Sequence, residues 1–145
     1  MIGLLQRVTH ASVTINGDVV ATINKGLLVL VGIEKNDSDQ NAVRLLEKLI
    51  AYRVFADDQD KMNLSLKDIN GELLLVPQFT LVADTQKGLR PSFSNPAPPE
   101  HSRKIFKFLI QHAREQYSNV QTGIFGADMQ VNLTNDGPVT FWLQT

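Results

Sequence analysis

The clearest local signal in the sequence is Ser12-Val-Thr-Ile-Asn-Gly-Asp-Val-Val-Ala-Thr-Ile23. Two runs rich in β-branched residues flank Asn16-Gly17, and an Asn-Gly pair favours the left-handed backbone of a tight two-residue turn. The stretch therefore predicts a β-hairpin. On its N-terminal side, the apolar run from Ile2 to Val8 predicts another strand. On its C-terminal side, Gly26 to Ile33 lacks polar alternation, which is typical of a strand buried on both faces.

Two segments predict helices. In the first, Asp37 is the expected N-cap, with Gln40 three residues later as in a capping box. The second helix is expected to begin at Pro98-Pro99-Glu100, because proline suits the first turn of a helix. Apolar residues follow at helical spacing in both segments. They are Val43, Leu46, Leu49, Ile50 and Val54 in the first segment, and Ile105, Phe108, Leu109 and Ala113 in the second.

The remaining pattern predicts more strands and one long irregular loop. Leu73 to Leu81 is strand-like but interrupted by Pro77, and residues 84–99 contain four prolines. Two last strands are expected at 129–133 and 139–143, joined by a turn at 134–138. Many strands with few helices predict an α+β fold. We expect curved mixed β-sheets that form a barrel-like core, with two main helices packed outside.

Length and composition limit the possibilities further. The chain has 145 residues, 43% of them hydrophobic and 20% charged, which predicts a single globular domain spanning 1–145. It has no cysteine, which excludes disulfides, thiolate metal sites and cysteine nucleophiles. Residues 1–7 lack the pattern of a signal peptide. The longest apolar run, 26–33, is too short to cross a membrane. We therefore expect a cytoplasmic protein without membrane association.

Standard catalytic motifs do not occur. The sequence has no phosphate-binding loop, dinucleotide fingerprint, nucleophile elbow or zinc-protease helix. His10, His101 and His112 are not at the spacing of metal ligands. Asp57, Asp58 and Asp60 resemble part of a calcium loop, but the glycine and the closing glutamate are missing, so a solvated acidic turn is favoured. The sequence thus predicts no metal, no cofactor and no conventional side-chain catalyst.

Two short segments carry the remaining signal. Pro77-Gln78-Phe79-Thr80-Leu81 would offer amide, hydroxyl and backbone N–H groups to a ligand at the end of a strand. Taken alone, however, the segment is more typical of a strand that ends at a proline, with Phe79 in the core. Asn135-Asp136-Gly137-Pro138-Val139-Thr140 has, by composition alone, the features of an ordinary hairpin connection.

Taken together, the two segments resemble the D-aminoacyl-tRNA deacylase family. The resemblance extends to residues 1–8, to the loop 84–95 and to Ala97-Pro98-Pro99, and it covers essentially the whole chain. One departure is plain, because Pro77 stands where the family usually has serine. A hydroxyl and a backbone N–H are lost at that position, so no role of that serine can be assigned here.

The resemblance implies an aminoacyl-tRNA editing enzyme, a carboxylic ester hydrolase. It would cleave the ester of D-aminoacyl-tRNA, and of glycine mischarged on alanine tRNA. An aminoacyl ester is already activated, and the neighbouring ribose hydroxyl can help to activate water, so the protein needs mainly to orient the ester. The resemblance further implies that catalysis is RNA-assisted. The implied catalytic residues are Gln78, Phe79 and Thr80. A Thr80 nucleophile ranks second, because no base is recognisable beside it.

The resemblance also implies how L-amino acids are excluded. Gly137-Pro138 would be cis and would project into the active site of a neighbouring subunit, leaving no room for an L side chain. Arg7 would hold this motif, and Met129 and Ala97 would contact substrate. The protein is then expected to be an obligate homodimer with its active site at the subunit interface.

The charge distribution agrees with an RNA ligand. The net charge is -1, but residues 87–114 carry +5, whereas 1–86 and 115–145 carry -3 each. A concentrated basic region is what a phosphate backbone requires, although a solvated helix face would look the same. The candidate tRNA-binding residues are Lys87, Arg90, Arg103, Lys104 and Lys107. Three alternatives remain open: a non-catalytic tRNA-end-binding module, a purely structural dimer and a metal-dependent hydrolase.

Overall fold

The computed structural model describes residues 1–94 and 96–145; Asn95, the last residue of the loop 84–95, lies outside the described residues. The elements follow the order β1 (Ile2–Ile15), β2 (Asp18–Ile23), β3 (Gly26–Gly32), α1 (Asp39–Ala51), β4 (Phe55–Ala56), β5 (Met62–Leu64), β6 (Glu72–Pro77), a short 3-10 helix η1 (Phe79–Val82), α2 (Pro99–Gln116), β7 (Val120–Thr122) and β8 (Gln130–Gln144). No helix in these two ranges has the length and apolar character that a membrane span would need.

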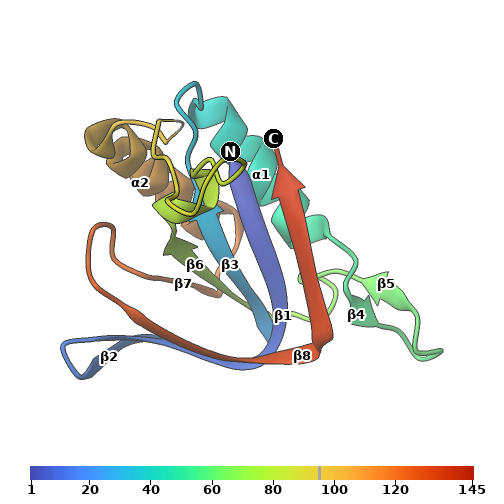
Figure 1. Ribbon diagram of the computed structural model, residues 1–145. Coiled ribbons are helices and arrows are strands. Elements are labelled where there is room, and N and C mark those ends of the chain that lie inside the picture. The colour runs from blue at the N-terminus through green and yellow to red at the C-terminus, as the bar shows by residue number, and fades with distance from the viewer. Residues whose placement is uncertain (95) are drawn as a thin grey trace.

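The main sheet is mixed. Its order is β2-β1-β3-β6-β7, and β8 pairs with β1. β1 runs antiparallel to β2, β3 and β8, whereas β3, β6 and β7 are parallel. The connection from β3 to β6 carries α1, and the connection from β6 to β7 carries α2. Figure 1 shows the two helices side by side on one face of the sheet, as expected.

The core lies on both sides of β3 and β6. Side chains of a strand alternate between faces, so Leu27 and Val29 pack under the helices while Leu28 points the other way. On that other face, β2 and the first half of β8 curl over the sheet and enclose a second apolar cluster (Figure 1). The barrel-like core is therefore confirmed. The second cluster consists of Val8, Ala11, Val13, Ala21, Ile23, Leu28, Leu74 and Val76.

The predicted hairpin is confirmed. Asn16 and Gly17 both have positive φ, 52° and 89°, as a tight left-handed turn requires. The predicted N-terminal strand 2–8 is part of the same element, because β1 runs without interruption from Ile2 to Ile15. β8 explains its length, since it pairs with β1 from Ile2 opposite Gln144 to Thr14 opposite Gln130.

The predicted turn at 134–138 is wrong. β8 is one strand, and both of its halves pair with β1. Thr140 lies opposite Gln6 and Asn135 opposite Val8, so the four residues 136–139 bulge out where the partner strand has only Arg7. A Gly-Pro pair suits a bulge as well as a hairpin turn, and only the partner strand decides between them.

The N-terminus of α1 also differs from the prediction. The N-cap is Ser38, whose backbone N–H donates to Asn41 Oδ1 at 3.0 Å. Asp37 is instead buried, and its carboxylate accepts hydrogen bonds from the Met1 amino group and from the backbone N–H of Glu34, both at 2.6 Å. The helix ends at Ala51, so Val54 lies beyond it.

Candidate functional site

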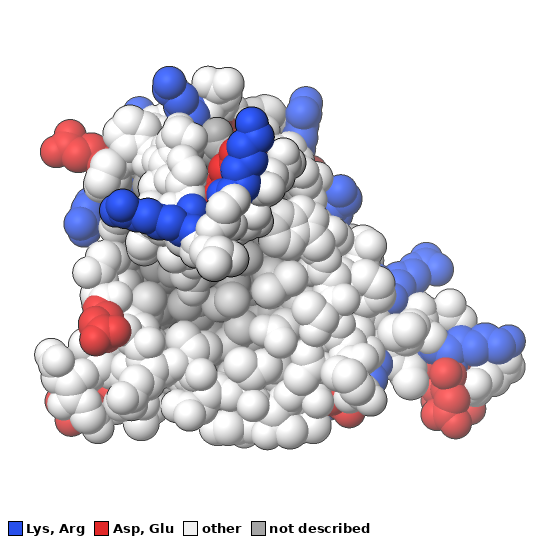
Figure 2. Space-filling model, viewed as in Figure 1, with Lys and Arg blue, Asp and Glu red and all other residues white. Residues whose placement is uncertain are grey.

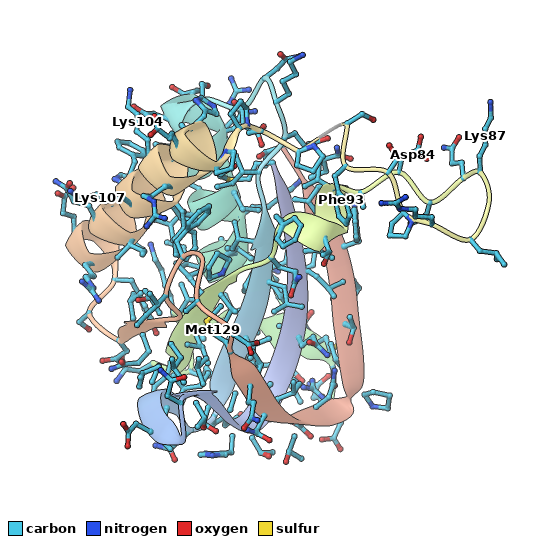
Figure 3. The ribbon with its side chains drawn as sticks, turned by 60° about the vertical axis from the view of Figure 1, so that its left-hand side comes forward. Asp84, Lys87, Phe93, Lys104, Lys107 and Met129 are labelled. Atoms are coloured by element: carbon cyan, nitrogen blue, oxygen red, sulfur yellow. The ribbon has the colours of Figure 1, made fainter. Side chains whose placement is uncertain are left out.

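The candidate site lies where the three parallel strands end. Parallel strands present their carboxyl ends at the same edge of a sheet, which is where open α/β sheets bind ligands. Lys35 follows β3, Gln78 and Phe79 follow β6, and Phe125 follows β7. Helix α2 and the loop before it close this edge from the side (Figure 3).

These segments surround a cavity of about 780 Å³. That volume falls within the usual range of small-molecule sites, about 300–1,000 Å³. The wall is mainly apolar, and Lys35 is the one charged side chain among the described residues that line it. The residues that matter for its chemistry are Gln78, Phe79, Phe93, Ala97, Phe125 and Met129.

One wall is an aromatic pair at the mouth. Phe79 and Phe93 have ring centroids 5.4 Å apart, and the two side chains are 59% and 51% exposed. The alternative in which Phe79 belongs to the core is therefore wrong. Phe93 directly follows the stem of a loop, the residue pair Asp84 and Ser92, which exchange two backbone hydrogen bonds of 2.9 Å. Residues 85–91 project beyond this stem, with Lys87 at the far end of the loop (Figure 3).

The opposite wall is the segment 123–129. The Phe125 ring lies 6.4 Å from that of Phe106, and the guanidinium carbon of Arg103 lies 5.0 Å from the Phe125 centroid. The backbone N–H of Ile124 contacts the Met129 sulfur at 3.4 Å. The wall is thus fixed from α2 on one side and from Met129 on the other.

Thr80 lies beside the cavity but does not line it. Its hydroxyl oxygen lies 2.5 Å from Gln78 Nε2, which is an amide donor and not a base. Within the described residues no histidine or carboxylate is hydrogen-bonded to it. Among residues 1–94 and 96–145, the backbone N–H groups of Phe79 and Thr80, at the start of η1, donate to no backbone carbonyl outside η1.

The bulge at 136–139 is held by side chains on both sides. Arg7 Nε donates to the carbonyl of Asp136 at 3.0 Å and lies 3.2 Å from its carboxylate, and Nη1 donates to the carbonyl of Val54 at 2.6 Å. Asn135 Oδ1 accepts from the N–H of Val139 at 2.7 Å. The Gly137-Pro138 peptide bond is cis, and both residues are exposed.

The structure therefore separates the predicted site residues into two groups. Gln78, Phe79, Ala97 and Met129 line one cavity, with Thr80 adjacent to it. Arg7, Gly137 and Pro138 form the second group, and none of them lines that cavity.

The candidate tRNA-binding residues divide as well. Lys87 and Arg90 belong to the projecting loop, and Arg103 lies against the cavity wall. Lys104 and Lys107 point outward from α2, away from Phe93 and Met129 (Figure 3).

Asp57 and His101, which the sequence did not assign to a site, both have structural partners. The Asp57 carboxylate accepts hydrogen bonds from the Asn63 amide and from the backbone N–H groups of Lys61 and Gln59. These bonds lower the pKa of Asp57, and they make the segment an acidic turn that is closed by its own residues. His101 Nε2 lies 2.8 Å from the carbonyl oxygen of Asp37.

Sequence reasoning missed Lys35, Phe93 and Phe125 as site residues. The signal that could have identified Lys35 and Phe125 is their position in the chain, because each follows a strand that is parallel to β6. The parallel pairing itself could not be deduced, since β7 is only three residues long.

Comparison with known proteins agrees with this geometry. Residues 4–144 match the family model described as D-Tyr-tRNA(Tyr) deacylase. Curated proteins named D-aminoacyl-tRNA deacylase are 57% identical in Proteus mirabilis, 60% in Pseudomonas putida and 61% in Legionella pneumophila, each over 99% of both chains.

Two solved structures are also similar. A c-Myc DNA unwinding element binding protein has a TM-score of 0.95 at 36% identity and covers 100% of this chain and 99% of its own. A probable eukaryotic D-amino acid tRNA deacylase has a TM-score of 0.85 at 16% identity, over 99% of this chain and 98% of its own, which shows the shared fold. With its full-length match to the family model and its close relatives, this chain belongs to the D-Tyr-tRNA(Tyr) deacylase family.

Proposed function

We propose that this protein is a D-aminoacyl-tRNA deacylase, which hydrolyses the ester between a D-amino acid and the terminal ribose of tRNA. The observation that carries the proposal is the cavity beside Phe79: it is large enough for an aminoacylated nucleoside, and no carboxylate or histidine is among the described residues that line it. Such a site suits a substrate that brings its own activating group. The family membership supplies the substrate class.

The reaction needs little from side chains. Water adds to the ester carbonyl carbon, the bond from that carbon to the ribose oxygen breaks, and the proton lost by the water goes to the leaving ribose oxygen. The adjacent ribose hydroxyl of the RNA positions or activates the water. The N–H groups of Phe79 and Thr80 are suited to the negative charge that develops on the carbonyl oxygen.

Because the ribose hydroxyl activates the water and the backbone N–H groups bind the carbonyl oxygen, Thr80 is not needed as a nucleophile. Thr80→Ala should retain substantial deacylation, because the hydroxyl faces the Gln78 amide and not a base. A tRNA whose terminal ribose lacks the 2′-hydroxyl should not be turned over. Loss of activity in Thr80→Ala to the uncatalysed rate, together with full turnover of the deoxy substrate, would favour a Thr80 nucleophile instead.

Exclusion of L-amino acids is assigned to Gly137-Pro138 of a second copy of the chain. These residues are exposed and lie outside the cavity of their own chain, so they reach a substrate only across a subunit interface. A D side chain, or the hydrogen of glycine, points away from the motif, which is why glycine mischarged on alanine tRNA is included among the proposed substrates.

An apolar surface supports the proposal of a second copy. Leu4 pairs with Leu30 on one side and Trp142 on the other, giving an apolar row across three strands, and Trp142 is 53% exposed. An added Cβ on Gly32, two residues from Leu30, would lie 3.1 Å from Leu81, so η1 packs on this same face. In Figure 2 the central and lower part of the front face is almost free of charged side chains, which lie on its upper part and along its edges. Exposed aromatic and aliphatic surface of this kind is typical of an interface.

A non-catalytic tRNA-end-binding module is the alternative. It predicts affinity for tRNA without release of the amino acid, so incubation with D-tyrosyl-tRNA and measurement of free D-tyrosine separates the two. Release that continues in excess chelator would also exclude a metal-dependent hydrolase. A dimer with only a structural role would show no salt-dependent affinity for tRNA.

A further inference from the structure

Arg103 is held in one orientation but has free donors. Its guanidinium carbon lies 5.0 Å from the centroid of the Phe125 ring, and an added Cβ on Gly126 would lie 3.6 Å from Arg103 Nη2. Stacking on an aromatic face fixes the plane of a guanidinium group. Among the hydrogen bonds and ion pairs of residues 1–94 and 96–145, none uses an Arg103 N–H group. An exposed arginine that lies over an aromatic ring and has free N–H groups is suited to an external anion.

An anion bound by Arg103 would lie at the rim of the cavity. Phe125 and Gly126 both line the cavity, and Arg103 contacts both from the outside. In the proposed function the ester lies at Phe79, and the 5′ carbon is on the other side of the ribose from the ester-bearing hydroxyl. A nucleoside bound in this way would present its 5′ side to the opposite wall, 123–129, and so to the rim where Arg103 lies. The neighbouring Lys104 carries the same charge but points outward from α2 (Figure 3). Successive residues of a helix point about 100° apart, so only one of the two faces the rim.

We propose that Arg103 binds the 5′-phosphate of the terminal nucleotide, and so positions the ester-bearing ribose beneath Phe79. This inference rests on the proposed function. Arg103 is then a binding residue whose guanidinium group is positioned by the Phe125 ring. Its role differs from that of the other basic side chains of α2, which do not face the cavity. A planar guanidinium group can bind two phosphate oxygens at once, which a lysine at this position could not do.

Binding of small ligands tests the proposal without any turnover. Adenosine 5′-monophosphate and adenosine are titrated separately into the wild-type protein, Arg103→Gln and Lys104→Gln, and the dissociation constants are measured by calorimetry. The wild type and Lys104→Gln should bind the monophosphate about tenfold more tightly than adenosine, as expected for one charge-assisted contact. Arg103→Gln should bind both ligands equally. Equal binding by the wild type, including no binding of either ligand, would overturn the proposal, as would a phosphate preference that survives in Arg103→Gln.

Turnover gives a second test. With D-aminoacyl-tRNA as substrate, Arg103→Gln should raise KM about tenfold and leave kcat close to wild type, because the contact is made equally in the bound and transition states. With a D-aminoacyl adenosine that lacks the phosphate, the same variant should match the wild type. An equal loss on both substrates would contradict the assignment. If the wild type hydrolyses neither substrate, the proposed function fails, and the binding comparison still decides the role of Arg103.

Discussion

Gly137→Ala is the substitution that most sharply probes the exposed bulge of β8. Gly137 has φ of 138°, a backbone conformation that costs a residue with a side chain about 1–3 kcal/mol. An added Cβ would lie 2.6 Å from Val139 Cγ2, 2.9 Å from the Val139 nitrogen and 3.3 Å from Arg7 Nη2. Carbon atoms pack best at about 3.5–4.0 Å, so the bulge must move by roughly 1 Å.

The consequence for function follows from that displacement. A misplacement of about 1 Å can reduce a positioned interaction by about 10²-fold. The ratio of D- to L-aminoacyl-tRNA hydrolysis should therefore fall by about two orders of magnitude, because the motif that we propose to exclude the L side chain is no longer in place. The assay measures amino acid release from matched D- and L-aminoacyl-tRNAs.

Gly17→Ala is the matched control. Gly17 also has positive φ, 89°, but an added Cβ would meet nothing within 4 Å, and the residue lies in the β1–β2 turn. Both variants should lose stability in thermal unfolding, by about 4 °C for each kcal/mol in a domain of this size. Only Gly137→Ala should lose discrimination. Unchanged discrimination in Gly137→Ala, or the same loss in both variants, would refute the role of the bulge.

Three further outcomes are expected. Tyr117→Phe removes a buried hydroxyl that donates to the carbonyl of Gly71 at 2.6 Å, and should lower the free energy of unfolding by about 1–2 kcal/mol in denaturant titrations without changing deacylation. Burial by itself would raise the pKa of Glu34, but hydrogen bonds from the Met1 amino group and from Gln144 outweigh it and leave the pKa below its ordinary value of 4.5. The stabilisation by Glu34 is therefore present above pH 4.5 and is lost as the pH falls through the lowered pKa. The difference in the free energy of unfolding between Glu34→Gln and the wild type should disappear in acid. A difference that stays constant with pH would show that the Glu34 charge does not contribute to it. Arg103→Gln should reduce the slope of log affinity for tRNA against log salt by about 0.7, and an unchanged slope would contradict a phosphate contact.

The elements with local signals could be predicted from the sequence. The hairpin at Asn16-Gly17 depends on the backbone preference of two adjacent residues, and the buried strand β3 on an uninterrupted apolar run. The second helix begins where its prolines place it, at Pro99. These three predictions are correct because each element is determined by the residues within it or directly beside it.

The errors have non-local causes. Whether Gly137-Pro138 turns the chain or bulges from a strand is decided by pairing with β1, more than 120 residues away in the sequence. Asp37 has the composition of an N-cap, but its carboxylate is used by the Met1 amino group, which only tertiary folding brings near. The same limit applies to the cavity, because Lys35 and Phe125 join Phe79 only through the parallel order of β3, β6 and β7.

In the proposed function, this chain hydrolyses D-aminoacyl-tRNA and leaves the L form intact. The most direct measurement uses one tRNA charged separately with D- and L-tyrosine, and follows the release of each amino acid by the purified wild-type protein. We expect release of D-tyrosine at a rate proportional to protein concentration, with L-tyrosine released only at the rate seen without protein. Equal release of both, or release of neither, would contradict it.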